Sequence, residues 1–228
     1  MIKQQPAQIY LATARGQRQT QGYNCWSTFN FGNYQEESKK GFGSLFLFNY
    51  HILAPKQSTT IVTQKDSLQY FLPLYGGIKY INPQEEKETL IITEQIEQIV
   101  SNEETTFELS NPFDENVSFL QIGFNAKTTS FETDYLKFDF EEKNKLISLF
   151  KNNTATAFIA QFDGRKELHY QLKNKQNGIF VYIINGAFEF ENRLLESGDA
   201  LSLKETEVVE WESLSKNAML LLIEIPLV

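Results

Sequence analysis

The sequence predicts an all-β protein, built as a sandwich or barrel in one large or two small domains, and three observations lead to this prediction. Short apolar and aromatic runs recur along the 228-residue chain and are separated by Gly, Asn and Pro turn signals, a pattern typical of a sandwich or barrel. Phe occurs 19 times and Tyr 10 times, against two Met, and aromatic residues favour strands. The length suits one large or two small domains, and the second half repeats the style of the first.

The first half is expected to hold a series of antiparallel strands. Two strands between residues 69 and 82 should be broken at Gly76-Gly77, because paired glycines signal a turn. Pro73 inside that pattern predicts a sheet edge or a bulge, since proline donates no ladder hydrogen bond. Further strand-like runs occupy residues 43–55, 88–102, 105–113 and 119–126.

A charged, aromatic stretch at residues 131–142 contains neither Gly nor Pro and is expected to join the two halves. We therefore expect one domain at residues 1–130 and a second at residues 131–228. In the second half, Asn185-Gly186 predicts a tight hairpin, and the sequence from Glu196 to Asp199 predicts another turn. Residues 143–152 could form a strand or a helix, and we favour a strand because strand-like runs follow.

Charge and cysteine content exclude several classes of protein. The 21 Lys and Arg against 29 Asp and Glu give a net charge of −8, which argues against nucleic-acid or membrane-surface partners. The one cysteine, Cys25, cannot form an intramolecular disulfide, so a reducing compartment is expected. No run reaches the 18 apolar residues of a membrane helix, and no signal peptide is visible. A cytoplasmic location is therefore predicted.

One aromatic motif carries a family resemblance. The stretches WSTFNFGNY (26–34), GFGSLFLFN (41–49) and LAP (53–55) closely resemble the N-terminal signature of the pirin family. Members of that family are bicupins, with two cupin barrels in one chain. The second half resembles the C-terminal barrel of quercetinase-like members. The resemblance implies one metal ion in the first barrel, held by a His-x-His pair and a His-x-Glu pair. Residues two apart on a strand face the same way, so each pair would point into the barrel.

This sequence departs from the family pattern at all four ligand positions. Counting back from Gly76 places the first pair on Val62 and Gln64, and the second pair falls on Glu108 and Ser110. Only two histidines occur, His51 and His169, and they lie far apart in the sequence. We therefore expect no catalytic residue, no metal and no cofactor. These four residues remain candidates for lining a pocket, together with Leu68 and Tyr70, which share their parity and should also face the barrel interior.

A carboxylate inside a barrel is costly unless it is paired, so Glu108 should bond Gln64 and Ser110 or a water, hold its proton, or mark a ligand site. In the second half, His169, Tyr170, Glu189, Glu191 and Asp199 are weaker candidates, and alternation places His169 and Tyr170 on opposite faces.

Two functional hypotheses remain open. The favoured one is a non-catalytic pirin-like bicupin that binds a small molecule or a protein partner. The alternative is a quercetin 2,3-dioxygenase-like oxidoreductase with an atypical site.

Overall fold

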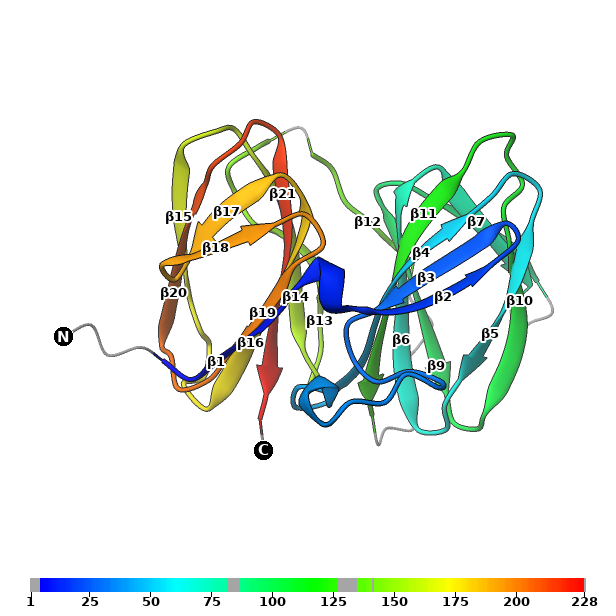
Figure 1. Ribbon diagram of the computed structural model, residues 1–228, viewed down its shortest axis with the longest axis horizontal. Coiled ribbons are helices and arrows are strands. Elements are labelled where there is room, and N and C mark those ends of the chain that lie inside the picture. The colour runs from blue at the N-terminus through cyan, green and yellow to red at the C-terminus, as the bar shows by residue number, and fades with distance from the viewer. Residues whose placement is uncertain (1–4, 82–86, 127–134, 141, 228) are drawn as a thin grey trace. The chain divides into compact units, whose positions relative to one another are not determined.

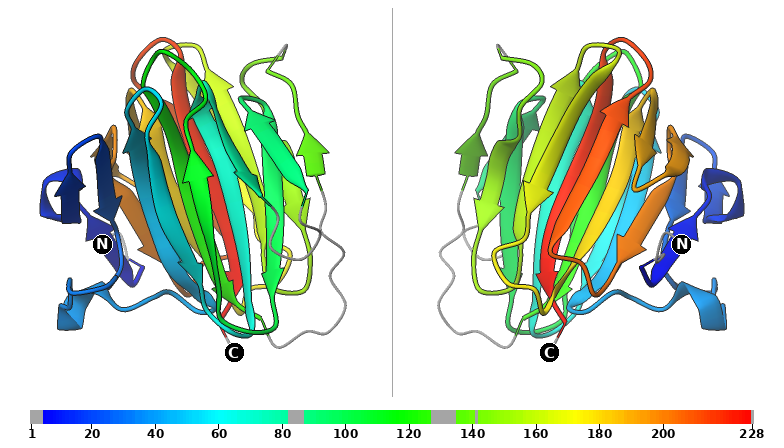
Figure 2. Two further views of the ribbon diagram at one scale, coloured as in Figure 1. Left: turned by 90° about the vertical axis from the view of Figure 1, so that its right-hand side faces the viewer. Right: turned by 90° about the vertical axis from the view of Figure 1, so that its left-hand side faces the viewer.

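A computed structural model describes residues 5–81, 87–126, 135–140 and 142–227. The described residues form 21 strands and two three-residue 3-10 turns, η1 (Ala12–Ala14) and η2 (Glu37–Lys39). The strands form two compact units, each with two antiparallel sheets (Figures 1 and 2). The predicted all-β, two-barrel fold is therefore confirmed.

The first barrel has a seven-stranded sheet in the order β12-β9-β6-β11-β4-β3-β2 and a four-stranded sheet in the order β5-β10-β7-β8. Its strands are β2 (Gly16–Thr20), β3 (Tyr23–Ser27), β4 (Leu45–Leu53), β5 (Ser58–Thr63), β6 (Ser67–Tyr75), β7 (Gly77–Ile81), β8 (Glu88–Ile92), β9 (Gln95–Ser101), β10 (Thr105–Ser110), β11 (Val117–Asn125) and β12 (Tyr135–Lys137).

The core of the first barrel lies between these two sheets. Leu53, Phe71 and Phe119 come from the larger sheet, and Ile61 and Phe107 from the smaller one. Phe71 meets Phe107 edge to face, with ring centroids 5.9 Å apart, an arrangement that aromatic pairs favour. The residues of this core cluster mark the inner face of each strand. Because side chains alternate along a strand, the other residues of the strand can then be assigned to the inner or the outer face.

Pro73 lies at a bulge, as the sequence predicted. The pairing of β6 with β11 shifts between Pro73 and Tyr75, so that Leu74 has no partner in β11. The other neighbour, β9, pairs only as far as Phe71, so no ladder bond needs the missing proline N–H. Directly afterwards, Gly76 adopts a φ of +71°, and a Cβ there would lie 2.7 Å from Val117 Cγ1. The predicted break between two strands is thus confirmed.

The second barrel has a six-stranded sheet in the order β1-β19-β16-β21-β14-β13 and a four-stranded sheet in the order β15-β20-β17-β18. Its strands are β1 (Ala7–Tyr10), β13 (Ile147–Lys151), β14 (Thr156–Phe162), β15 (Lys166–Gln171), β16 (Asn177–Asn185), β17 (Ala187–Phe190), β18 (Arg193–Glu196), β19 (Ala200–Leu203), β20 (Val208–Ser213) and β21 (Ala218–Pro226). Residues 147–151 form a strand, as favoured, and Gly186 makes the predicted turn at a φ of +80°.

Aromatic rings fill the second core. Phe190 stacks on Trp211 with centroids 5.4 Å apart and an interplanar angle of 3°, and Phe162 packs edge-on against Trp211. The predicted turn after Glu196 is held by Asp199, whose Oδ2 accepts from the Glu196 backbone N–H and whose Oδ1 accepts from Ala12. Asp199, a weak site candidate in the sequence, therefore serves the turn.

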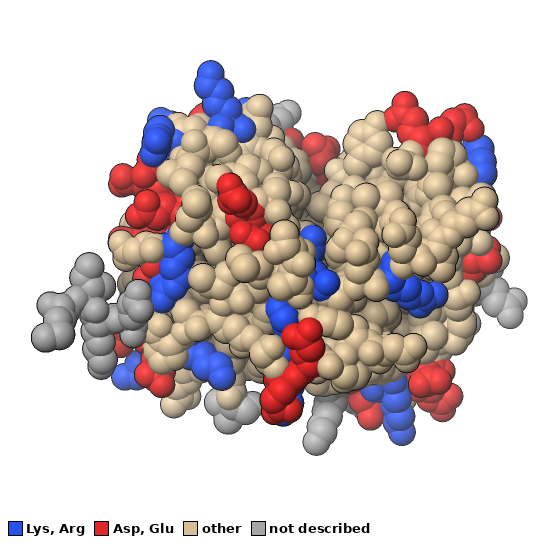
Figure 3. Space-filling view, in the orientation of Figure 1, with Lys and Arg blue, Asp and Glu red and all other residues tan. Residues whose placement is uncertain are grey.

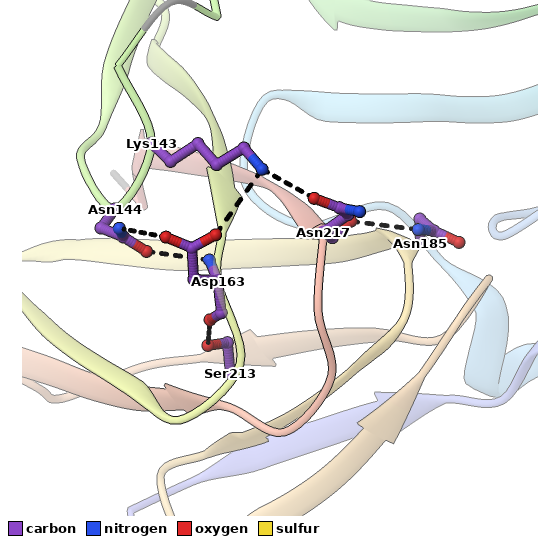
Figure 4. A network of polar contacts seen from close by, with 6 residues as sticks. All are labelled: Lys143, Asn144, Asp163, Asn185, Ser213 and Asn217. Atoms are coloured by element: carbon purple, nitrogen blue, oxygen red, sulfur yellow. Dashed lines mark hydrogen bonds and ion pairs between the residues drawn. The ribbon is translucent and has the colours of Figure 1, made fainter.

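A polar network ties loops of the second barrel together (Figure 4). Asp163 accepts from the Asn144 side chain at 3.0 Å and lies 3.6 Å from Lys143 Nζ. The hydrogen bond from Asn144 and the nearby Lys143 charge lower the pKa of the Asp163 carboxyl. Lys143 also donates to Asn217 Oδ1, and the Ser213 hydroxyl donates to the Asp163 backbone carbonyl. Because Asn185 donates to the Asn217 carbonyl, the network joins four segments.

The N-terminal residues do not follow the predicted domain division. Strand β1 pairs along its length with β19 of the second barrel, and residues 5–15 cluster with that barrel rather than with the first. The physical reason is that β19 would otherwise leave an unpaired edge. At the other junction, β12 still pairs with β9, and the predicted boundary between residues 130 and 131 lies outside the described residues.

We expect Tyr10 to account for most of the attachment of β1, since it is 1% exposed whereas Ile9 is 43% exposed. Tyr10→Ala should lower the free energy of unfolding by about 3 kcal/mol, the usual cost of deleting a buried aromatic ring. The matched change Ile9→Ala should cost less than about 1 kcal/mol. Urea denaturation of both variants tests this, and equal losses would contradict it.

Candidate functional site

Three of the predicted pocket residues face solvent. Val62 is 48% exposed, and Gln64 and Glu108 are exposed as well. Their neighbours Ile61 and Phe107 belong to the core instead. The prediction that Val62, Gln64 and Glu108 face the barrel interior is therefore wrong. The count back from Gly76 passed through the bulge at Leu74, and one unpaired residue is enough to reverse the face to which a strand residue is assigned.

The other three candidates are also misplaced. Ser110 is half-buried and shares the parity of Glu108, and its hydroxyl donates to the Lys79 carbonyl. Glu108 and Ser110 line a shallow hollow of about 390 Å³ on the outer face of the four-stranded sheet. Leu68 and Tyr70 are fully buried, but their parity is opposite to that of Phe71, so they lie on the other face of β6. The Tyr70 hydroxyl donates to Gln98 Oε1 at 2.7 Å.

A chain of buried polar side chains occupies the inner face of the seven-stranded sheet. Tyr23 Oη lies 2.9 Å from His51 Nδ1, and His51 Nε2 lies 3.2 Å from Gln121 Oε1. Gln121 Nε2 donates to Gln69 Oε1 at 2.7 Å. Because an amide oxygen only accepts, His51 must carry its proton on Nε2, and Tyr23 must donate to Nδ1. The four strands β3, β4, β11 and β6 are thus joined by hydrogen bonds that run in one direction.

His51 is held neutral at the centre of this chain. It is fully buried, and burial lowers the pKa of its imidazole to about 3, because desolvation disfavours the charged form. Its ring stacks on Phe119 at 4.5 Å and on Tyr23 at 5.8 Å. Burial likewise raises the pKa of the Tyr23 hydroxyl, so the chain contains no ion near neutral pH.

The structure places Cys25 directly opposite His51 across β3 and β4. Cys25 is fully buried, its Sγ lies 3.9 Å from Ser27 Oγ, and both nitrogens of His51 are already engaged. A catalytic cysteine needs an accessible thiolate beside a free base. These two residues therefore do not form a nucleophile–base pair.

Beyond the histidine, three polar atoms on this inner face lack partners. Asn49 Nδ2, Asn49 Oδ1 and Gln69 Nε2 are buried and have no hydrogen-bond partner among the described residues. Both side chains are 0% exposed. An unpaired buried amide group costs about 1–3 kcal/mol, so each such atom calls for a partner such as a bound water or another small molecule.

In the second barrel, the sequence analysis placed His169 and Tyr170 on opposite faces, and the structure confirms it. His169 is exposed, whereas Tyr170 packs against the core and donates to Glu224 Oε2 at 2.6 Å. His169, Glu189 and Glu191 line a hollow of about 570 Å³ on the outer sheet face. Glu224, which the sequence analysis did not single out, is buried and also accepts from two backbone N–H groups and from Asn177.

Comparisons with known proteins agree with this architecture. Residues 143–225 match the family model described as the quercetinase C-terminal cupin domain. The structure resembles that of YhhW from Escherichia coli at a TM-score of 0.87 and 15% identity, over 98% of this chain and 99% of that one.

The chain has a bicupin fold.

Other solved structures share the pirin-like fold. A nickel(II) complex of the E. coli pirin YhhW matches at a TM-score of 0.86 and 16% identity, over 98% of this chain and 100% of that one. A quercetin 2,3-dioxygenase from Acinetobacter baumannii matches at 0.71 and 11% identity, over 96% of this chain and 78% of that one. No curated protein matches the sequence.

The residues inside the first barrel do not fit a transition metal. Within the described ranges, no three His, Cys, Asp or Glu side chains lie close enough to share an ion. The inward-facing pairs on β5 and β10 are Ile61 with Thr63 and Phe107 with Leu109. The one histidine of this barrel uses both nitrogens internally, so the donor types that such metals prefer are missing.

On the face drawn in Figure 3, acidic and basic side chains are interspersed. Among the described residues, no helix is long and apolar enough to cross a membrane.

We expect His51 to make stability pH-dependent. Its pKa is about 3 in the fold and about 6.5 in the unfolded chain, so its contribution is complete above pH 6.5. That contribution is lost as the pH falls from 6.5 toward 3, by about 2 kcal/mol between pH 7 and pH 5. His51→Gln, which cannot titrate, should lack this part of the decline, as measured by urea unfolding at both pH values.

The exposed His169 provides the matched control. His169→Gln should keep the parent's full decline between pH 7 and pH 5. If His51→Gln declined as steeply as the parent, the imidazole would not be the buried neutral group described above.

Proposed function

We propose that this protein is a metal-free, non-catalytic member of the pirin-like bicupins, whose first barrel binds a small molecule. The single observation that carries the proposal is the state of His51. A metal-ligating histidine needs one nitrogen free for the ion, and here one nitrogen accepts from Tyr23 while the other donates to Gln121.

The inward residues of the opposite sheet support the same proposal. Ile61 and Phe107 are apolar core residues, and Thr63 is committed to Ser101 and to the Thr105 carbonyl. Glu97, a buried acid on the inner face of β9, accepts from the Tyr80 hydroxyl. A dioxygenase would have to assemble its ligands from residues that already have structural partners.

The unpartnered amides favour binding over a purely structural barrel. Asn49 and Gln69 present hydrogen-bonding capacity that the described protein atoms leave unused, and polar groups of this kind orient ligands in otherwise apolar pockets. A cytoplasmic location accompanies the proposal, and the single buried cysteine supports it.

Metal analysis and oxygen uptake test the proposal. The purified, tag-free protein should retain no stoichiometric transition metal after dialysis, as measured by mass spectrometry of the elements. It should consume no oxygen with quercetin, with or without added iron, nickel, copper or manganese. E. coli YhhW, which has been crystallised with nickel(II), serves as the positive control for metal retention.

One metal ion per chain that survives dialysis would contradict the metal-free assignment. Metal-dependent oxygen uptake with quercetin would favour the oxidoreductase alternative instead.

A further inference from the structure

Strand β1 forms one end of the six-stranded sheet and buries a single side chain there. Among the described residues its strand neighbour is β19 alone, beside which it runs in Figure 1. Three of its four side chains are exposed, and only Tyr10 is buried. At the other end of the same sheet, β13 buries both Leu149 and Phe150. Because segments with few buried apolar contacts open at the lowest free-energy cost, β1 should detach before the rest of the sheet.

The chain is clamped directly after β1. The Ala12 N–H group donates to Asp199 Oδ1 at 2.7 Å. Arg15 Nη1 donates to the Tyr182 hydroxyl at 3.2 Å, and the guanidinium carbon lies 5.8 Å from the centroid of the same ring. These contacts do not involve β1, so the strand can leave the sheet while the clamp stays in place.

The edge that β1 covers is held from its other side. All four residues of β19 pair with β16, and all four are buried. The edge therefore keeps its shape when β1 leaves, and its backbone groups then need new hydrogen-bond partners. The Tyr10 ring lies 6.2 Å from the ring of Phe180, and its hydroxyl lies 3.4 Å from Ser202 Oγ. Release of β1 thus leaves a strand edge beside a space that fits an aromatic ring.

The ladder identifies the N–H groups through which β1 is attached. The Lys204 N–H group donates to the Pro6 carbonyl, and hydrogen-bonded pairs alternate along an antiparallel ladder. Gln8 and Tyr10 therefore exchange bonds with their partners in β19, whereas the N–H group of Ile9 points away from the sheet.

The chemistry of a replacement strand follows from the strand that it replaces. Residues 5–10, QPAQIY, carry no charged side chain, and the exposed positions impose little selection. We propose that the outer edge of β19 is a docking site for a partner protein, which adds an extended, uncharged segment with an aromatic side chain in the place of Tyr10. Strand addition of this kind draws its affinity from backbone bonds and its specificity from side-chain pockets. Strand β1 is the releasable internal occupant of this site.

A fluorescein-labelled peptide with the sequence of residues 5–12, QPAQIYLA, serves as the probe for full-length variants. Gln8→Pro removes a ladder N–H group and should release β1. It should bind the peptide at least about tenfold more tightly than the parent in fluorescence anisotropy, because an internal strand competes at high effective concentration. Ile9→Pro is the matched control, since proline is tolerated where the N–H group faces away from the ladder, and it should bind no better than the parent.

Hydrogen exchange of the unmodified parent tests the release of β1 without any variant. The Gln8 and Tyr10 amides should exchange at least about tenfold faster than the ladder amides of β16, since β1 opens on its own.

Equal peptide affinities of Gln8→Pro and Ile9→Pro would overturn the inference. So would binding of a peptide whose tyrosine is replaced by alanine, or β1 amides that exchange only with global unfolding. If the parent forms dimers that the peptide dissociates, the edge is occupied by a second copy of this chain, which would contradict a separate partner.

Discussion

The burial of His51 is the constraint on which the first barrel depends. A buried imidazole is stable only when neutral and hydrogen-bonded at both nitrogens, and Tyr23 and Gln121 meet both requirements. The side-chain N–H group of Gln121 in turn needs a buried acceptor, and it donates to Gln69 Oε1. The chain therefore joins β3, β4, β11 and β6 by side-chain bonds in addition to the ladder bonds of the sheet, and it leaves the Gln69 N–H group as its unpaired end.

This chain of bonds also leaves His51 no free nitrogen for a metal ion. Ligation would require His51 to give up one of its two partners, leaving a buried hydroxyl or amide unpaired. The opposite sheet offers no substitute ligands at the inward positions of Ile61 and Phe107, because both are apolar core residues. The similarly folded E. coli pirin YhhW has been crystallised with nickel(II). In this protein, by contrast, the polar side chains of the His51 chain form hydrogen bonds between neutral groups.

Much of the fold could be predicted from the sequence, because strand periodicity and turn residues are local signals. Gly76, Asn185-Gly186 and the turn before Asp199 all marked real chain reversals. The attachment of β1 to the second barrel could not be predicted, since pairing between Tyr10 and Ala200 depends on contacts distant in sequence. The candidate site was misplaced for a related reason. The bulge at Leu74 has no clear sequence signal beyond Pro73, and a shift of one residue moved the first predicted pair from Ile61 to Val62. The second pair was aligned separately, on Gln98, and also fell one residue away from the inward-facing Phe107.

One signal for the observed site was present in the sequence. Gln121 interrupts an otherwise apolar run, and a polar residue in a buried strand requires a buried partner. His51 and Asn49 share a face of β4 by their spacing, but the strands that would adjoin them were unknown. The partners of a buried polar residue are set by sheet order, which a single sequence does not specify.

The central claim is that His51 is a neutral, fully hydrogen-bonded imidazole that binds no metal. Nitrogen-15 NMR of the labelled full chain tests it most directly, because the ring signals report the tautomer and the protonation state. The account predicts a neutral ring protonated on Nε2, unchanged between pH 7 and pH 5 and unaffected by excess nickel(II). A ring that titrates near pH 6.5, or signals that shift or broaden at His51 when nickel is added, would contradict it.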